Sequence, residues 1–140
     1  MNESVKKFND FLPKGDNTKL VSQRGKGKSF KIKKVIINEI IGIEVERVLK
    51  SYKFLPLSIF EDIINQLIST KSKFLSRGSA MKYKLGEGDL NKNSIEGYIA
   101  IKYYDRKKGD SVFRRISAIS NILVESGVCE HGRGILKLKK

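Results

Sequence analysis

Apolar residues recur along this chain with spacings that change from helical to strand-like and back. Near the start, Val5, Phe8 and Leu12 stand three and then four residues apart, which predicts a short amphipathic helix over residues 3–12. β-Branched and aromatic residues gather around positions 30–37 and favour a strand there. The first third of the chain is therefore expected to mix helix and strand.

Two more helices are predicted in the middle of the chain. Apolar residues between Ile37 and Tyr52 fall at helical spacing, although Gly42 lowers helix propensity by about 1 kcal/mol relative to alanine. Ser58 and Glu61 form a capping-box pattern that predicts the start of a second helix, ending near residue 70. Its buried face is expected to comprise Phe60, Ile63, Ile64, Leu67 and Ile68.

The pattern between residues 80 and 105 is less uniform. Residues 80–85 alternate like a short strand, and the segment 86–93 is typical of turns. Residues 94–105 fit two descriptions, because Ser94 can cap a helix whereas the isoleucines and tyrosines favour a strand. Periodicity alone leaves both open.

The last third of the chain predicts a helix, a glycine-bracketed loop and a short basic strand over 135–140. The helix covers residues 111–126, with Asp110 or Ser111 as its N-cap and Gly127 in the position that ends a helix. Its apolar stripe comprises Val112, Ile116, Ile119 and Leu123, widened by Phe113 and Ile122.

Composition points to one soluble domain inside the cell. The chain has 140 residues, about the length of one domain, and no apolar run approaches the ~18 residues needed to cross a bilayer. The first residues lack the apolar stretch of a secretory signal, so a cytoplasmic location is expected, associated with the nucleoid in a prokaryote. A single cysteine, Cys129, and a single histidine, His131, exclude a disulfide framework and a metal site built from those residues. No cofactor and no metal are expected.

The charge balance of the chain gives the strongest indication of its partner. The 29 Lys and Arg outnumber the 15 Asp and Glu, which indicates a polyanionic partner, nucleic acid before an anionic membrane surface. Residues 1–34 hold ten basic and three acidic side chains, whereas residues 35–70 hold three and five. Residues 1–29 are therefore predicted to be a mobile basic arm, and 30–140 a single α+β domain that binds nucleic acid. Residues 36–68 are a candidate homodimer contact.

The order of elements in the last part of the chain resembles a winged helix-turn-helix domain over roughly residues 57–138. A basic turn, Arg106-Lys-Lys-Gly, precedes the predicted helix, and the loop Cys-Glu-His-Gly-Arg-Gly follows it. The resemblance implies an α+β fold with winged-helix-like helices and a short sheet. It also implies that helix 111–126 enters the major groove and that residues 129–138 form a wing along the phosphate backbone. The turn over 104–110 is longer than in the compact motif.

The polar face of the same predicted helix indicates DNA contacts. Arg114, Ser117 and Asn121 lie opposite the apolar stripe, and arginine pairs with guanine as asparagine does with adenine, while Arg115 is expected to reach a phosphate. The expected function is non-catalytic binding of duplex DNA, as in a transcriptional regulator. The full set of predicted contacts comprises Arg24, Lys26, Lys28, Arg106, Lys107, Lys108, Ser111, Arg114, Arg115, Ser117, Asn121, His131, Arg133 and Lys137.

Three other functions stay open on the sequence. An RNA-binding component of a ribonucleoprotein would use the same basic ends, with tyrosines as stacking platforms. A small magnesium-dependent nuclease would use Glu87, Asp89 and Glu96, although the acid-x-Lys spacing expected of a nuclease strand is absent. The third alternative is an adaptor that binds a larger protein.

Overall fold

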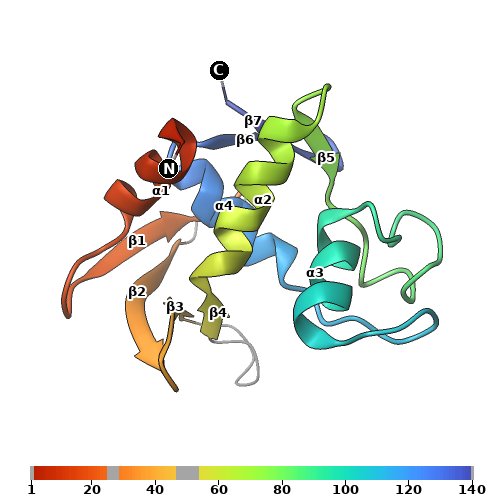
Figure 1. Ribbon diagram of the computed structural model, residues 1–140, viewed down its shortest axis with the longest axis horizontal. Helices are drawn as coiled ribbons and strands as arrows, with labels where there is room; N and C mark the ends of the chain where they lie inside the picture. The colour runs from red at the N-terminus through yellow and green to blue at the C-terminus, as the bar shows by residue number, and fades with distance from the viewer. Residues whose placement is uncertain (1, 25–28, 47–53, 140) are drawn as a thin grey trace.

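Four helices and two antiparallel sheets are formed by residues 2–24, 29–46 and 54–139, the part of the chain that this computed structural model describes. The larger sheet has the strand order β1-β2-β3-β4, and the smaller sheet has the order β5-β7-β6. Figure 1 shows α2 crossing the centre of the molecule, between the larger sheet and α3. In chain order the elements are α1 (Glu3–Phe11), β1 (Thr18–Ser22), β2 (Ser29–Ile37), β3 (Ile40–Val45), β4 (Phe54–Pro56), α2 (Leu57–Ser69), β5 (Phe74–Ser76), α3 (Ile95–Tyr104), α4 (Ile116–Glu125), β6 (Cys129–His131) and β7 (Ile135–Leu138). The α+β class is as predicted.

α1 confirms the amphipathic helix predicted near the N-terminus. The side-chain Oδ1 of Asn2 accepts a hydrogen bond from the backbone N of Val5 at 2.8 Å, which caps the helix. Val5 and Phe8 are buried, and the Phe8 ring stacks on Phe60 of α2 with 5.1 Å between centroids. Burial of these rings holds α1 against α2.

The prediction that residues 1–29 form a mobile arm is wrong for residues 2–24. β1 pairs antiparallel with β2 along its whole length, and Val21 is fully buried. The apolar residues of this segment are few, but their spacing places them in the main core together with those of α2 and α4. Lys26 and Lys28 lie outside the described residues.

β2 confirms the predicted strand, whereas the helix predicted over residues 37–52 is wrong where the structure describes it. β3 occupies this region and pairs antiparallel with β2, burying Ile43 completely. A Cβ added to Gly42 would lie 2.4 Å from the Phe54 ring and 2.6 Å from the carbonyl oxygen of Leu55. The glycine is therefore explained by the close approach of β4. The rest of the predicted helix lies outside the described residues.

The structure shows two helices, α2 and α3, in the middle of the chain. α2 confirms the second predicted helix, but its N-cap is Pro56 and the Ser58 hydroxyl does not cap it. Of the two descriptions that residues 94–105 allowed, the helix is correct: α3 covers Ile95–Tyr104, and the hydroxyl oxygen of Ser94 caps it by accepting a hydrogen bond from the N of Gly97 at 3.1 Å. Residues 80–85 form turns and not a strand. The apolar residues of this region form a small second core: Leu85, Leu90, Ala100 and Val112.

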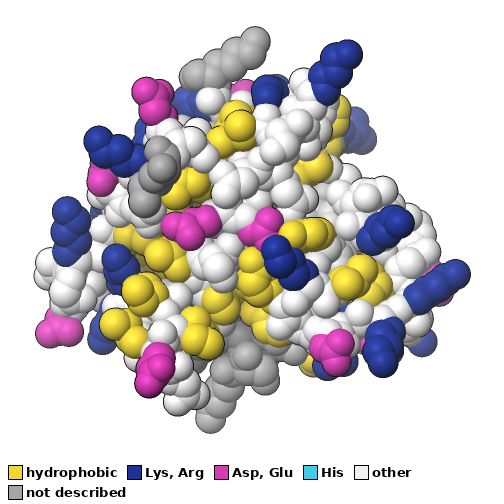
Figure 2. Space-filling view, in the orientation of Figure 1, with side chains coloured by type: hydrophobic (Ala, Val, Ile, Leu, Met, Phe, Trp, Pro, Cys, Tyr) yellow, Lys and Arg dark blue, Asp and Glu magenta, His cyan; other side chains and the backbone are white. Residues whose placement is uncertain are grey.

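Several exposed hydrophobic side chains are concentrated in one part of the surface. Hydrophobic side chains gather over the end of the larger sheet in Figure 2, where Ile36, Ile37, Ile40 and Ile41 are exposed. Lys and Arg side chains are scattered over the face shown there and do not form one patch on it. None of the helices that the structure describes is long and apolar enough to cross a membrane.

Candidate nucleic-acid interface

The start of α4 is set by a side chain that is distant in sequence. The carboxylate Oε1 of Glu96 accepts hydrogen bonds from the backbone N of Arg115 at 2.7 Å and of Ile116 at 3.2 Å. Glu96 is fully buried, and this burial raises its pKa to about 7 despite the two backbone hydrogen bonds. The helix consequently begins at Ile116, and the predicted N-terminal boundary at residue 111 is wrong.

The residues predicted to cap this helix have other partners or positions. The Asp110 carboxylate accepts a hydrogen bond from the backbone N of Lys107 at 2.7 Å, and so it closes the turn between α3 and α4. Ser111 is exposed and lies before the helix. Gly127 has a positive φ of 84° directly after the C-cap, as predicted.

The apolar stripe of α4 is confirmed, but two polar predictions are corrected. Ile116, Ile119, Ile122 and Leu123 are buried in the main core, whereas Val112 lies before the helix in the small second core and Phe113 is exposed. Asn121 does not project into solvent: it is 6% exposed, and its Oδ1 accepts a hydrogen bond from the backbone N of Arg24 at 3.2 Å. The chain that follows β1 therefore covers Asn121, whereas Arg114 and Ser117 stay exposed.

Arg115 is likewise buried and unsuited to the phosphate contact predicted for it. Its side chain is 5% exposed, and the guanidinium carbon lies 3.3 Å from the centroid of the Tyr104 ring. A guanidinium stacked on an aromatic face is a stabilising contact within the fold. The prediction failed because Tyr104 belongs to α3, and spacing along α4 carries no information about it.

A pocket of about 430 Å³ opens beside the N-terminal half of α4. Its wall combines α4, the chain after β1, the loop after β5 and the β6–β7 hairpin. We call it the arginine pocket, after the three arginines Arg24, Arg77 and Arg114 that line it. It brings together five of the predicted contact residues: Arg24, Arg114, Ser117, Asn121 and His131.

The three arginines reach the pocket from separate parts of the chain. Arg24 Nη1 and Arg77 Nη2 each donate a hydrogen bond to the carbonyl oxygen of Gly132 at 3.1 Å, which fixes both to the β6–β7 turn. Arg114 Nη1 contacts the Met81 sulfur at 3.1 Å. Burial, and then the charges of Arg24 and Arg114, lower the pKa of Arg77. The positive charges are thus close enough to repel one another.

Little negative charge offsets this cluster. Neither of the ion pairs recorded among the described residues involves a pocket arginine. Asp89 is the one carboxylate in the described lining, held by hydrogen bonds from the N and the hydroxyl of Ser79 at 2.9 and 3.1 Å, and its single negative charge is outnumbered by the positive charges of the three arginines and Lys82. The arginine pocket is therefore an electropositive concavity.

Two buried polar atoms of the pocket lining have no hydrogen-bond partner within the described structure. They are the hydroxyl oxygen of Ser120, a residue only 1% exposed, and Nδ1 of His131. Burial, and then the charges of Arg24 and Arg77, lower the pKa of His131, so its ring is neutral at pH 7. Buried polar atoms are normally paired, so these two are exceptions that a bound group would explain.

Six of the other predicted contacts are exposed and do not line the pocket: Arg106, Lys107, Lys108, Ser111, Arg133 and Lys137. Arg106, Lys107 and Lys108 are exposed in the turn between α3 and α4. Arg133 is exposed in the β6–β7 turn, and Lys137 of β7 pairs with Glu130 of β6 at 3.5 Å.

The acidic residues considered for a nuclease have structural partners. Glu87 Oε1 accepts a hydrogen bond from the backbone N of Lys84 at 3.0 Å, while Asp89 binds Ser79 and Glu96 caps α4. The described part of the chain holds no group of three or more His, Cys, Asp or Glu that could bind a metal ion. The predicted magnesium cluster is therefore not assembled by these residues.

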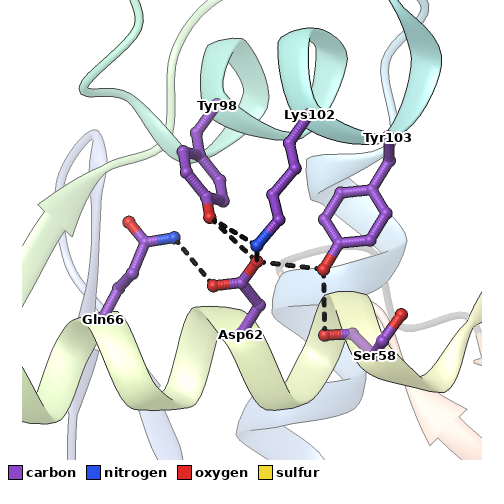
Figure 3. Close-up of polar contacts among 6 residues, drawn as sticks. All are labelled: Ser58, Asp62, Gln66, Tyr98, Lys102 and Tyr103. Carbon is purple, nitrogen blue, oxygen red and sulfur yellow. Dashed lines mark hydrogen bonds and ion pairs between the residues drawn. The ribbon is translucent and has the colours of Figure 1, made fainter.

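Two of the tyrosines considered as stacking platforms instead join α3 to α2 (Figure 3). Asp62 Oδ2 accepts hydrogen bonds from the hydroxyls of Tyr98 and Tyr103, both at 2.9 Å, and forms an ion pair with Lys102 at 2.7 Å. Burial acts to raise the pKa of Asp62, but the hydrogen bonds from Lys102, Tyr98, Tyr103 and Gln66 outweigh it and the pKa is lowered. This cluster fixes α3, and with it Glu96, against α2.

Sequence reasoning missed Arg77 and Ser120. In the sequence, only the positive charge of Arg77 could have indicated its role; the residue stands in a short Ser-Arg-Gly-Ser segment at the end of β5. Its backbone is held on both sides, since its N donates to the Gly134 carbonyl and its own carbonyl accepts from the N of Glu96, both at 3.0 Å.

No family model, curated protein or solved structure matches the chain.

Proposed function

We propose that this chain binds nucleic acid, with duplex DNA as its preferred form, through the arginine pocket and the adjoining β6–β7 hairpin. The observation that carries the proposal is the convergence of Arg24, Arg77 and Arg114 on one concavity, where none of the ion pairs recorded among the described residues involves them. Arginine suits this task because its planar guanidinium binds phosphate oxygens through paired hydrogen bonds. The net charge of +14 supplies attraction at longer range.

The order of elements supports a winged-helix type of binding domain. α2, β5, α3, α4, β6 and β7 follow one another, and β7 lies between β5 and β6 in the smaller sheet. A helix followed directly by a hairpin is the order that the winged-helix resemblance implies, with α4 as the groove helix and β6–β7 as the wing. Because Asn121 is buried, the proposal assigns the pocket to phosphate contacts and not to base reading. A role in regulating transcription stays a prediction.

The test is the salt dependence of binding, measured by fluorescence anisotropy of a labelled duplex. Log affinity should fall as log salt concentration rises, by about 0.9 for each phosphate that the pocket and the hairpin neutralise. Arg114→Ala should weaken binding and make the slope shallower. Lys34→Ala, which removes an exposed charge on β2, is the matched control and should leave affinity nearly unchanged. A flat salt response, or equal losses in both variants, would overturn the proposal. Single-stranded DNA and duplex RNA are compared in the same assay.

We further propose that two copies associate through the β2–β3 tip, the described part of residues 36–68 where the exposed isoleucines form an apolar surface. Sedimentation equilibrium of the wild type and of Ile36→Lys tests this. The wild type should sediment as a dimer and the variant as a monomer, whereas a monomeric wild type contradicts the idea.

A further inference from the structure

We infer that the arginine pocket takes a terminal phosphate, a phosphomonoester at the end of a nucleic-acid strand, and not a phosphodiester within it. This inference rests on the proposed function and narrows its substrate class. It draws on the charge, the shape and the unpaired polar atoms of the pocket.

Charge favours a dianion. A phosphomonoester carries about −1.5 to −2 at pH 7 and has three terminal oxygens, whereas a phosphodiester carries about −1. Arg24, Arg77 and Arg114 surround one concavity, and the first two are already drawn to a single acceptor, the carbonyl oxygen of Gly132. A dianion compensates this local charge more completely than a single diester does.

The shape of the arginine pocket also favours a terminal phosphate over a phosphodiester. The pocket is a half-open concavity lined by Gln23 and Arg24 after β1, by the loop after β5, by α4 and by the β6–β7 hairpin. A continuous backbone has to enter and leave its binding site, and duplex DNA presents its phosphates on a convex surface. A strand end can insert its last group into a concavity of about 430 Å³ and leave the rest of the nucleic acid outside.

Unpaired polar atoms give the third observation. Ser120 is buried and lines the pocket, yet its hydroxyl has no partner in the described structure, and Nδ1 of His131 is in the same situation. A hydroxyl can donate to a phosphate oxygen, as can an imidazole N–H. Ser117, exposed at the first turn of α4, adds a second hydroxyl. A phosphoryl group with three free oxygens accepts from several of these donors together with the guanidiniums.

The experiment compares duplexes that differ only at their strand ends. Affinities for 5′-phosphate, 3′-phosphate and hydroxyl-ended forms of one duplex are measured by competition against a labelled duplex. A duplex that carries the recognised terminal phosphate should bind about tenfold more tightly than the hydroxyl-ended form, the gain expected of a charge-assisted hydrogen bond. Arg114→Ala and Ser120→Ala should reduce this ratio, whereas Lys34→Ala should leave it unchanged. Adenosine 5′-monophosphate and adenosine are included to separate a strand end from a free nucleotide.

The outcomes are distinguishable. If all three ends bind equally and Arg114→Ala weakens them equally, the terminal-phosphate inference fails while the proposed nucleic-acid function stands. If adenosine 5′-monophosphate binds through Arg114 and no duplex binds, both the strand-end source and the proposed function fail. If neither nucleotide nor duplex binds, both fail as well. A tenfold ratio that is lost in Arg114→Ala and in Ser120→Ala supports the inference, and circular dichroism confirms that each variant is folded.

Discussion

Replacing Glu96 with glutamine should change how the stability of the protein depends on pH. Burial raises the pKa of Glu96 to about 7 in the folded state, against 4.5 for a free glutamate. Between these values the folded state keeps a proton that the unfolded chain has lost, so the contribution of Glu96 is fully present below pH 4.5 and declines as pH rises through 7. At about 1.4 kcal/mol per pKa unit, the decline amounts to about 3 kcal/mol.

Glutamine preserves the cap without the titration. Its amide oxygen can accept the hydrogen bonds that the N atoms of Arg115 and Ile116 donate to Glu96. Urea unfolding between pH 4.5 and 8 should show the wild type losing up to about 3 kcal/mol relative to Glu96→Gln across this range. Glu44→Gln, which alters an exposed carboxylate on β3, is the control and should follow the wild type. Parallel profiles for the wild type and Glu96→Gln would refute the reasoning.

Four further predictions concern the fold. Asn121→Ala should lower the free energy of unfolding in urea by about 1 kcal/mol, because it removes the part-buried hydrogen bond that Asn121 accepts from the backbone N of Arg24; an unchanged value would restore Asn121 as a surface residue. Phe8→Ala should cost about 3–5 kcal/mol in the same assay, whereas a mobile N-terminal arm predicts no loss. Asp62→Asn should flatten the acid side of the stability profile: the pKa of Asp62 is lowered, so its contribution is present above pH 3.8 and is lost as pH falls below it. Burial raises the pKa of Cys129 to about 12, so iodoacetamide should modify this thiol slowly in the folded protein and rapidly in urea, as mass spectrometry can measure.

Elements whose apolar spacing allowed one structure were predictable from the sequence. α1, β2, α2 and the buried stripe of α4 follow from local periodicity, because each buries a face that its own residues define. β3 was not predictable in this way, since its isoleucines fit a helix as well as a strand. The deciding contact is its pairing with β2 across Asn38 and Glu39, both of which have positive φ, at 51° and 69°. Asn-Glu is a weaker hairpin signal than Asn-Gly.

The residues of the candidate site also fall into two groups, one that the sequence could identify and one that it could not. Arg24, Arg114, Ser117 and His131 were identified by residue type and charge, and the fold brings them to one pocket. Roles that depend on contacts with residues far away in the sequence could not be predicted from the sequence. Asn121 is bound by a backbone amide from the other end of the chain, and the basic residue Arg77 joins the pocket only because β5 pairs with β7.

The most direct test of nucleic-acid binding at the arginine pocket is an NMR titration of the ¹⁵N-labelled protein with a short duplex that carries 5′-phosphates. Backbone amide shifts should change most at Arg24, Arg77, Arg114 and His131, and the changes should shrink as salt is added. The amides of the β2–β3 tip, at the far end of the larger sheet, should stay in place. Changes confined to that tip or to α1, with the pocket amides unmoved, would contradict the proposal.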